Sequence, residues 1–239
     1  MLNFFKKSLV RSGVFNGFID YHSHILPGVD DGIKTMESSL EVLAHYEEIG
    51  IKEVWLTPHI MEDIPNTTSA LRERFEKLKD AYDGTITLHL ASENMLDALF
   101  EERLDNGDLL PMGPRGDHLL VETSYFSPPM DLYGILDKIM HKGIRPILAH
   151  PERYVYMDKA DYQRLKEMGV KFQINITSLV GAYGKEAKDK AEMMLKEKWV
   201  DLTGTDVHKL HAIQFAGNQK VLKKTTIKQL YEIHSQKPF

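Results

Sequence analysis

The sequence predicts an α/β fold, a distorted (β/α)7 barrel with mainly parallel strands. From Phe18 onward, apolar strand-like runs alternate with segments of helical period, a pattern typical of such a barrel. Seven strand-like runs occur, near residues 18, 53, 86, 119, 146, 172 and 201. This is one fewer than in the common eight-stranded barrel, so we expect incomplete closure. The length of 239 residues, with 42% hydrophobic and 27% charged residues, suits a single domain with a large core.

Segments of helical period lie between the strand-like runs. The first shows its signals most clearly, because Thr35 can cap its start and Gly50 can end it. The next separates apolar from charged positions, which predicts a surface helix. The predicted helices cover residues 35–49, 69–82, 94–104, 132–141, 159–168 and 185–198, with Gly143 and Gly169 as stops.

Residues 1–17 form an N-terminal extension to a domain predicted over residues 18–239. Charges interrupt the apolar stretch of the extension, so it resembles neither a secretory signal nor a spanning helix, and no membrane insertion is predicted. Phe4, Phe5 and Leu9 could share a short amphipathic helix that touches a membrane or a partner. We favour the alternative, in which the segment packs against the domain or frays.

Charge and cysteine content exclude several classes of protein. The formal net charge of -5 and a pI near 6.1 give no general attraction to nucleic acid or to an anionic membrane. The chain has no cysteine, which excludes disulfides and thiol nucleophiles and leaves only nitrogen and oxygen ligands for a metal. A cytoplasmic protein is the simplest interpretation.

Side chains that bind metal ions well stand at, or just after, the end of nearly every strand-like run. His22 and His24 are two residues apart in an extended run, so both imidazoles point the same way, and Asp206 and His208 repeat this spacing. Strands that meet at one rim of a barrel would bring these groups to one pocket. The candidate metal ligands are His22, His24, Asp31, His59, Glu93, Glu122, His150, Asp206 and His208.

Simpler roles stay open for the individual residues. His22 and His24 could be two surface histidines, Glu93 could cap a helix, and Glu122 could be a solvated strand end. We interpret Asp30 as a turn residue. The remaining six histidines are interpreted as surface or core residues: His45, His89, His118, His141, His211 and His234.

Arg153 follows His150 by three residues, after the apolar strand-like run RPILA. A guanidinium beside a metal cluster suits a phosphate, which it can grip with two parallel hydrogen bonds. Arg153 is therefore the candidate catalytic and substrate-binding residue. Glu152 could be a metal ligand or could hold Arg153, and we favour the second role.

The motifs DYHSHILPGVDDG, TPH, AHPERY, QINITSLVGAYG and TDVH, in this order from about residue 20 to 208, resemble the PHP (polymerase and histidinol phosphatase) metallophosphoesterases. They are most similar to the branch of manganese-dependent protein-tyrosine phosphatases found with bacterial capsule and exopolysaccharide genes. Asp31 supports this branch, because other branches tend to have histidine there. The resemblance implies a PHP barrel with three ions at the C-terminal rim of its strands. One ion would be held by His22, His24, Glu93 and Asp206, the second by Glu93, Glu122 and His150, and the third by Asp31, His59 and His208.

The resemblance implies a phosphomonoesterase that hydrolyses phosphotyrosine by a metal-bound hydroxide, for example on a bacterial tyrosine kinase of polysaccharide synthesis. Mn²⁺ is expected, and Fe or Zn would suit the same ligand types. The branch usually has an arginine after the final D-x-H pair, whereas this chain has none beyond Arg164. Lys209 is expected to bind substrate in its place, or the substrate preference differs.

Other functions would keep the same ligands. They are a histidinol-phosphate phosphatase, a phosphodiesterase of the same superfamily, and a metal-binding regulatory module whose catalysis has lapsed. The sequence does not indicate an oligomeric state.

Overall fold

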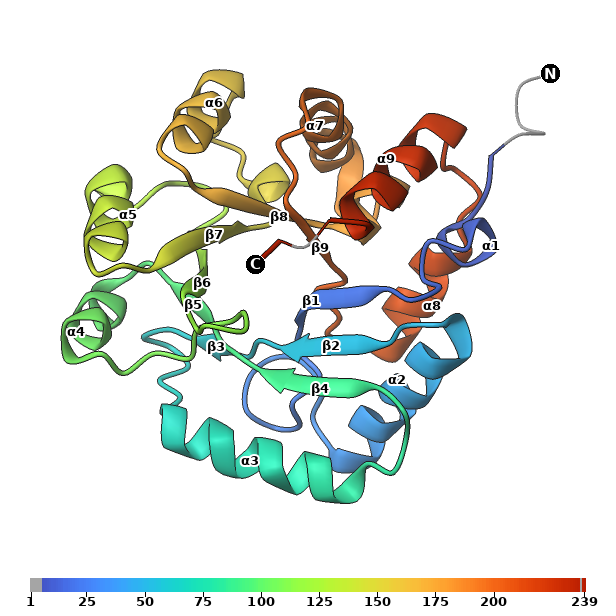
Figure 1. Cartoon of the computed structure of the whole chain (residues 1–239), viewed down its shortest axis with the longest axis horizontal. Coiled ribbons are helices and arrows are strands. Elements are labelled where there is room, and N and C mark those ends of the chain that lie inside the picture. Colours follow the sequence, from blue (N-terminus) through green and yellow to red (C-terminus); the bar gives the residue numbers. More distant parts are fainter. Residues whose placement is uncertain (1–5, 237) are drawn as a thin grey trace.

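A computed structural model describes residues 6–236 and 238–239 of the chain. In this part, parallel strands curl into a barrel that a ring of helices surrounds (Figure 1). The strands are β1 (Ile19–Ser23), β2 (Glu53–Leu56), β3 (His59–Ile60), β4 (Thr87–Leu90), β5 (Glu93–Met95), β6 (His118–Glu122), β7 (Arg145–Ala149), β8 (Lys171–Asn175) and β9 (Leu202–Gly204). They pair in the orders β1-β2-β4 and β3-β5-β6-β7-β8-β9.

The seven predicted strand-like runs become nine strands because two of them are interrupted. The second run is broken at Thr57 and Pro58, and the third at Ala91 and Ser92. Proline has no N–H to donate to a strand ladder, so β2 cannot continue directly into β3. The first part of each broken run belongs to the smaller sheet and the second part to the larger one. The two sheets therefore follow one another around a single barrel, and the predicted α/β barrel is confirmed.

The first and last strands close the barrel at their C-terminal ends only. Among the described residues they share one bridge, between Ser23 and Val207, and two backbone hydrogen bonds. These run from His24 N to Val207 O at 3.1 Å and from Asp206 N to His22 O at 2.8 Å. A Cβ on Gly204 would lie 2.5 Å from the Cβ of His22, so this close approach requires glycine. The barrel is thus distorted, as the strand count predicted.

Helices and two short 3-10 turns connect the strands. They are α1 (Leu9–Ser12), α2 (Met36–Ile49), α3 (Thr68–Ala81), α4 (Ala98–Asn106), α5 (Leu132–His141), η1 (Pro151–Arg153), α6 (Lys159–Glu167), η2 (Ile176–Val180), α7 (Gly184–Glu197), α8 (Leu210–Asn218) and α9 (Lys224–His234). Five of the six predicted helices lie within one residue of these bounds.

The helix predicted over 94–104 is wrong at its start, and two helices were not predicted. Asn94 lies in β5, and α4 begins only after Asp97, whose side chain accepts a hydrogen bond from Phe100 N at 2.9 Å. Helices α8 and α9 follow Lys209 and Lys223, which make no side-chain cap hydrogen bond. The usual start signal is therefore missing from the sequence at both helices.

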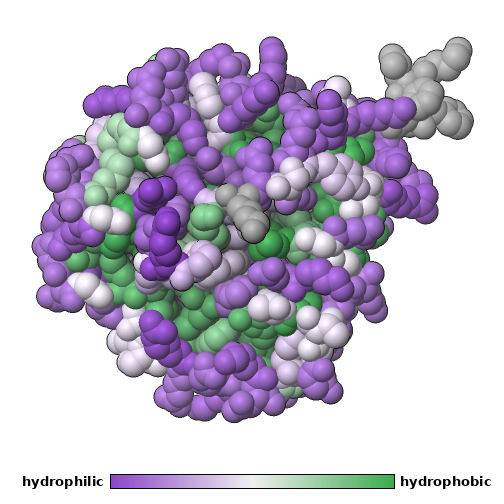
Figure 2. Space-filling view, in the orientation of Figure 1, coloured by the Kyte–Doolittle hydropathy of each residue, from purple (hydrophilic) through white to green (hydrophobic). Residues whose placement is uncertain are grey.

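Residues 6–17 pack against the barrel domain. Leu9, Val14 and Phe15 are buried in the main core, and Lys7 pairs with Leu222 through two backbone hydrogen bonds. This confirms the favoured interpretation for these residues, while Phe4 and Phe5 lie outside the described residues. The hydrophilic residues in Figure 2 lie mostly over the outer helices, with hydrophobic ones nearer the centre of that face. None of the described helices is long and apolar enough to span a bilayer.

Candidate metal centre

The structure brings all nine predicted ligands together at the rim formed by the C-terminal ends of the strands. The first group surrounds one oxygen of Glu93. Its Oε2 lies 3.2 Å from His22 Nε2 and 3.3 Å from His24 Nε2, and these two nitrogens are 3.1 Å apart. Oδ1 of Asp206 lies 3.6 Å from His22 Nε2 and 3.4 Å from His24 Nε2. All four side chains are buried.

The second group shares Glu93 with the first. Nε2 of His150 lies 2.9 Å from Glu93 Oε1 and 3.8 Å from Glu122 Oε2. Nδ1 of His59 also faces this group, 3.1 Å from Glu93 Oε2 and 2.9 Å from Glu122 Oε1. His59 was expected only in the third group, so the structure adds a contact that the sequence did not predict.

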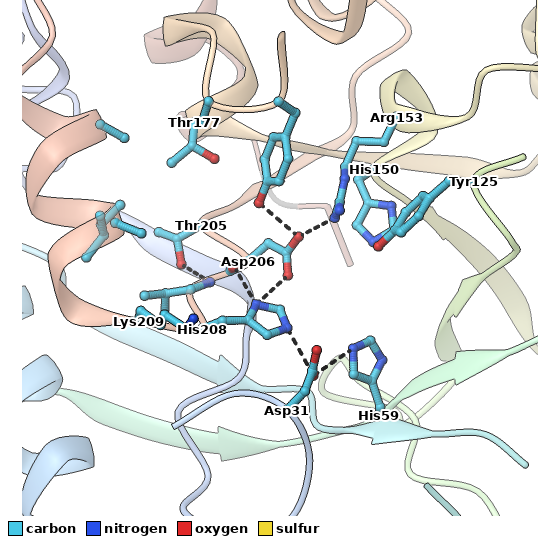
Figure 3. Close-up of a pocket in the computed structure, with 16 residues that line it drawn as sticks. Asp31, His59, Tyr125, His150, Arg153, Thr177, Thr205, Asp206, His208 and Lys209 are labelled. Carbon is cyan, nitrogen blue, oxygen red and sulfur yellow. Dashed lines mark hydrogen bonds and ion pairs between the residues drawn. The ribbon is translucent and has the colours of Figure 1, made fainter. Parts of the chain in front are cut away.

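The third group lies nearest to solvent. Oδ1 of Asp31 is 3.5 Å from His59 Nε2 and 3.3 Å from His208 Nε2, and Figure 3 shows Asp31 between these two rings. The ring of His208 stacks on that of His24, with centroids 4.1 Å apart. The side chain of Asp31 is 66% exposed, whereas Glu93 is fully buried. The cluster therefore opens outward through the third group.

Histidines and carboxylates in the cluster shift one another's pKa values. Burial alone would lower the pKa of His22, but the carboxylates of Glu93 and Asp206 outweigh it and raise that pKa to about 9. Burial acts on His59 in the same way, and Glu93 and Glu122 raise its pKa to about 12. In return, burial would raise the pKa of Glu93, but the neighbouring histidines hold it well below its usual value. The buried carboxylates thus favour the protonated forms of His22 and His59, and these imidazoles favour the charged form of Glu93.

Two polar side chains orient the imidazoles of His22, in β1, and of His24, directly after it. Nδ1 of His22 lies 2.7 Å from Gln173 Oε1, and Nδ1 of His24 lies 2.8 Å from Asp30 Oδ2. Both oxygens accept, so each ring donates from Nδ1 and turns Nε2 toward Glu93. Asp30 also accepts from the backbone N of His59 at 3.0 Å. Its interpretation as only a turn residue is therefore wrong.

Asp20 joins the two strand ends that carry the ligand pairs. Its Oδ1 accepts from the backbone N of Thr205 at 2.8 Å and of His22 at 3.3 Å. Its Oδ2 accepts from the hydroxyls of Thr205 at 2.7 Å and Tyr46 at 2.9 Å. Burial raises the pKa of Asp20 to about 6, against the effect of these donors. Asp20 thereby fixes His22 relative to Asp206, which follows Thr205.

Three donors hold Oδ2 of Asp206, the oxygen that faces away from the histidines. They are Arg153 at 2.8 Å, Asn175 Nδ2 at 2.7 Å and the Tyr183 hydroxyl at 3.2 Å. The guanidinium of Arg153 lies between the rings of Tyr125 and Tyr183, 4.2 Å from each centroid. The sequence did not single out Asn175 or Tyr183. The available signal was Gln173 and Asn175, two polar residues two apart in a buried strand, which point the same way.

Glu152 does not hold Arg153 by any hydrogen bond or ion pair in the structure, so that interpretation is wrong. The carboxylate instead accepts from Asn175 N at 2.9 Å and Ser178 Oγ at 2.7 Å. Glu152 is a buried residue of the 3-10 turn η1, and its carboxylate fixes the junction between β8 and η2. Glu152 thus supports Asn175, which in turn binds Asp206.

Two candidate ligands have strained backbone conformations. His150 has φ 33° and directly follows β7, and Asp206 has φ 53° and lies two residues after the end of β9. Left-handed backbone at a residue other than glycine costs on the order of 1–3 kcal/mol and concentrates at functional sites. The strain indicates that the directions of these two side chains matter more than local stability.

A cleft of about 440 Å³ lies over the cluster. One side of it carries Asp31, His59 and His208, and the opposite side carries Arg153 (Figure 3). Lys209, expected to bind substrate, lines the same cleft. The remaining lining is largely apolar or aromatic and comprises Tyr125, Ala182, Tyr183, Val207, Ala212, Ile213 and Ala216, with Thr177, Thr205, His150 and Asp206.

The donor set fits metal ions. The side chains form three sets, and within each set the possible ligand atoms all lie within 4.8 Å of one another. The sets are His24, Asp31, His59 and His208; His22, His24 and Glu93; and His59, Glu93 and Glu122. Buried His59 Nδ1, Glu93 Oε2 and Glu122 Oε1 make no hydrogen bond of standard geometry. Buried polar atoms without partners are costly, and cations placed between them would satisfy them together. Among the described residues, His150 and Asp206 lie outside these three sets but contact them through Glu93 and through His22 and His24, and the six histidines interpreted as surface or core residues also lie outside the sets.

Fold and donor set define an α/β barrel with groups able to hold several metal ions at one rim. The sequence model of the family described as "Capsular polysaccharide synthesis, CpsB/CapC" matches residues 18–231. The chain belongs to this family. The resemblance to the capsule-associated branch, based on the motifs, is thereby confirmed.

Curated relatives cover most of the chain. It is 28% identical over 203 residues to the tyrosine-protein phosphatase YwqE of Bacillus subtilis, with 82% of this chain and 80% of the relative covered. It is 28% identical over 212 residues to the tyrosine-protein phosphatase CpsB of Streptococcus agalactiae, with 80% and 83% covered. A putative tyrosine-protein phosphatase CapC of Staphylococcus aureus is 24% identical over 202 residues, with 80% and 77% covered.

Solved structures share the fold. One comes from work on YwqE of Bacillus subtilis and CpsB of Streptococcus pneumoniae, described there as unique metal-dependent tyrosine phosphatases. It matches with a TM-score of 0.77 at 23% identity over 92% of this chain and 89% of the other. A phosphotriesterase homology protein of Escherichia coli matches with a TM-score of 0.51 at 11% identity, over 91% and 92%. At these identities, both matches show the fold alone.

Proposed function

We propose that this protein is a metal-dependent protein-tyrosine phosphatase, a phosphoric monoester hydrolase. The observation that carries the proposal is the gathering of nine imidazole and carboxylate side chains below a cleft whose other side presents Arg153; seven of them form groups that could hold an ion, and His150 and Asp206 contact these groups. Ions held by Asp31, His59 and His208 on one side, together with the guanidinium of Arg153 on the other, would place positive charge on both sides of a phosphate dianion. The names of the curated relatives support the same activity.

The ligand geometry supports a site for three ions, with Mn²⁺ as the expected metal and Fe or Zn as alternatives of similar ligand preference. Bound ions would supply a nucleophilic water near neutral pH and neutralise charge on the phosphoryl oxygens. The proposed ligands are His22, His24, Glu93 and Asp206 for the first ion, Glu93, Glu122 and His150 for the second, and Asp31, His59 and His208 for the third. Nδ1 of His59, which faces the second group, is an additional candidate ligand there.

Arg153 would bind the phosphoryl oxygens. A guanidinium carries five N–H donors, so the bond to Asp206 leaves capacity for two parallel hydrogen bonds to phosphate. The rings of Tyr125 and Tyr183 each lie 4.2 Å from the guanidinium and restrict its rotation. Lys209 would add a second, more mobile positive charge at the cleft.

The apolar part of the cleft supports an aromatic ester as the substrate. Ala212, Ile213 and Ala216 line it from α8, and Tyr125 and Tyr183 line it from the loops. A phenyl ring would bury apolar surface there while its phosphate faces the ligands. Phenolate is also a good leaving group, which makes phosphotyrosine chemically easy to hydrolyse.

The physiological substrate is proposed to be a phosphotyrosine protein, and by family a bacterial tyrosine kinase of polysaccharide synthesis. We keep the division into an extension over residues 1–17 and a phosphatase domain over residues 18–239, together with a cytoplasmic location, as parts of this proposal. The family match beginning at residue 18 supports the division.

Metal analysis and kinetics test the proposal together. The purified protein should contain up to three ions per chain and hydrolyse a phosphotyrosine peptide, lose activity after chelation, and regain it with Mn²⁺. Histidinol phosphate and a phosphodiester serve as comparison substrates. Faster turnover of either one would contradict the assignment to phosphotyrosine, and a fully metal-loaded but inactive protein would support a regulatory module instead.

A further inference from the structure

Three of the large hydrophobic side chains that the structure exposes lie in two loops beside the cleft. Phe126 is 77% exposed, Met130 is fully exposed, and Val155 is 51% exposed. The loops that carry them follow β6 and β7, the strands that end at Glu122 and just before His150. The loops touch each other, because Val155 N donates to Tyr125 O at 2.9 Å. We call Phe126, Met130 and Val155 the rim patch.

The rim patch continues directly from the cleft. Tyr125, the neighbour of Phe126 in the sequence, lines the cleft, and the guanidinium of Arg153 stacks on its ring. The ring of Tyr154, the neighbour of Val155, lies 6.2 Å from that of Tyr125. A chain that leaves the cleft on this side would therefore meet apolar surface at once.

A groove of about 330 Å³ adjoins the rim patch. Met130, Tyr133 and Tyr156 form part of its lining. Its walls are held in place, since the Tyr156 and Thr123 hydroxyls are 2.6 Å apart and the guanidinium of Arg164 stacks 3.6 Å over the Tyr133 ring. The groove is therefore formed before any ligand arrives, which lowers the entropic cost of binding.

Charge selects among the partners that could cover this surface. The described residues that line the groove include two carboxylates, Asp131 and Asp161, and no basic side chain; the guanidinium of Arg164 stacks on the Tyr133 wall but is not part of the lining. Together with the formal net charge of -5, this disfavours nucleic acid and anionic lipid headgroups. It favours a peptide that carries both an apolar and a basic side chain. Exposed apolar patches beside a site commonly mark an interface of this kind.

We propose that the rim patch and the adjoining groove bind the polypeptide that flanks the phosphorylated residue of a protein substrate. An apolar side chain of the substrate occupies the groove, and a basic one lies near Asp131 and Asp161. This inference rests on the proposed function, which supplies the phosphorylated residue in the cleft. Binding at the rim patch and groove would make the protein select substrates by the sequence around the phosphorylated residue, whereas the cleft alone would not distinguish these sequences.

The test compares a small substrate with two phosphotyrosine peptides. One peptide carries Leu and Lys within three residues of the phosphotyrosine, and the second replaces both with Ser. The small substrate is phenyl phosphate, which is too short to leave the cleft. For the metal-loaded wild-type protein we expect kcat/KM to be about fivefold to tenfold higher for the Leu/Lys peptide, as for one buried apolar contact.

Phe126→Ser and Met130→Ser should each reduce this preference through a higher KM, with phenyl phosphate turnover unchanged. The control is Phe215→Ser, because Phe215 is a similarly exposed aromatic residue, 72% exposed, on α8 and outside the patch. It should leave the preference intact. Equal losses from Phe215→Ser and Met130→Ser, or equal losses on phenyl phosphate and peptide, would overturn the proposal.

Binding and sedimentation measurements cover the cases of an inactive protein and of a self-associating one. If the wild-type protein hydrolyses none of the substrates, the proposed function fails, and fluorescence anisotropy of the labelled peptides still tests docking. Equal affinity of both peptides for wild type would then refute docking at the rim patch. Sedimentation velocity identifies the competing occupant: a dimer that Phe126→Ser dissociates without changing peptide kinetics would show that a second copy covers the patch, contrary to the proposal.

Discussion

Replacing Glu93 with glutamine should weaken metal binding in the first and second groups while leaving the shape of the site almost unchanged. Both oxygens of Glu93 face imidazole nitrogens, with Oε1 2.9 Å from His150 and Oε2 within 3.3 Å of His22, His24 and His59. In Glu93→Gln the side chain keeps its size but loses its charge, and one of its two oxygens becomes an NH2 group that cannot coordinate a cation.

The magnitude follows from the charge that is lost. At an effective dielectric constant of about 20, two unit charges about 4 Å apart interact by about 4 kcal/mol. Because each 1.4 kcal/mol is about tenfold in an equilibrium constant, we expect metal affinity to fall by on the order of 10³. Since Glu93 lies between the first and second groups, two ions should be affected together, while the third group of Asp31 and His208 keeps its ligands.

Equilibrium dialysis against buffered Mn²⁺, followed by elemental analysis, measures the loss, and turnover of a phosphotyrosine peptide measures its effect. Glu53→Gln is the matched control, because Glu53 is also a carboxylate paired with an imidazole, 3.1 Å from His89, but lies at the other end of β2. The control should keep its full metal content. Wild-type metal content and activity in Glu93→Gln would refute the role of Glu93 as a shared ligand.

Three further predictions address other parts of the molecule. Asp20→Asn should lower the free energy of unfolding, measured in urea, by about 2–4 kcal/mol, because an amide cannot accept all four hydrogen bonds that the buried carboxylate accepts. An unchanged free energy of unfolding would contradict the role of Asp20 at the closure of the barrel. Arg153→Ala should lower kcat/KM for phosphotyrosine peptide by about 10²-fold to 10³-fold, and a loss fully explained by missing metal would show that the guanidinium serves only to hold Asp206. Burial lowers the pKa of His234 to about 4, below the value near 6.5 of the unfolded chain. Between these two pH values the unfolded state binds a proton that the folded state does not. The free energy of unfolding should therefore fall as the pH falls through this range, by up to about 3 kcal/mol. His234→Gln should lack this part of the pH dependence, measured as the difference in unfolding free energy from wild type at pH 7 and at pH 4.5, and a constant difference would contradict it.

The strands and most helices could be predicted because their signals are local. Period-two and helical patterns, caps such as Thr35 and stops such as Gly50 lie within a few residues of the elements that they define. The errors occurred where a local signal was absent or ambiguous. Helices α8 and α9 begin without a side-chain cap, and Glu93 is followed by a short strand rather than by the helix that its position allowed.

The roles of supporting residues could not be predicted in this way. Asp30 looked like a turn residue because its neighbours are turn-forming, yet its carboxylate reaches both His24 and His59. Glu152 stands beside Arg153 in sequence but binds the chain at Asn175 and Ser178. In each case the hydrogen-bond partners of the carboxylate are residues whose positions relative to it depend on the fold.

The sequence by itself determined which imidazole and carboxylate side chains stand at the strand ends, because strand direction and side-chain alternation are properties of neighbouring residues. Only the tertiary structure decided which nitrogen faces which oxygen. His59 turns one nitrogen to Glu122 and the other to Asp31, and Asp206 divides its oxygens between the histidines and Arg153. These contacts depend on how β9 closes against β1 and on the spacing of strands that are far apart in the chain, and no local pattern encodes those distances.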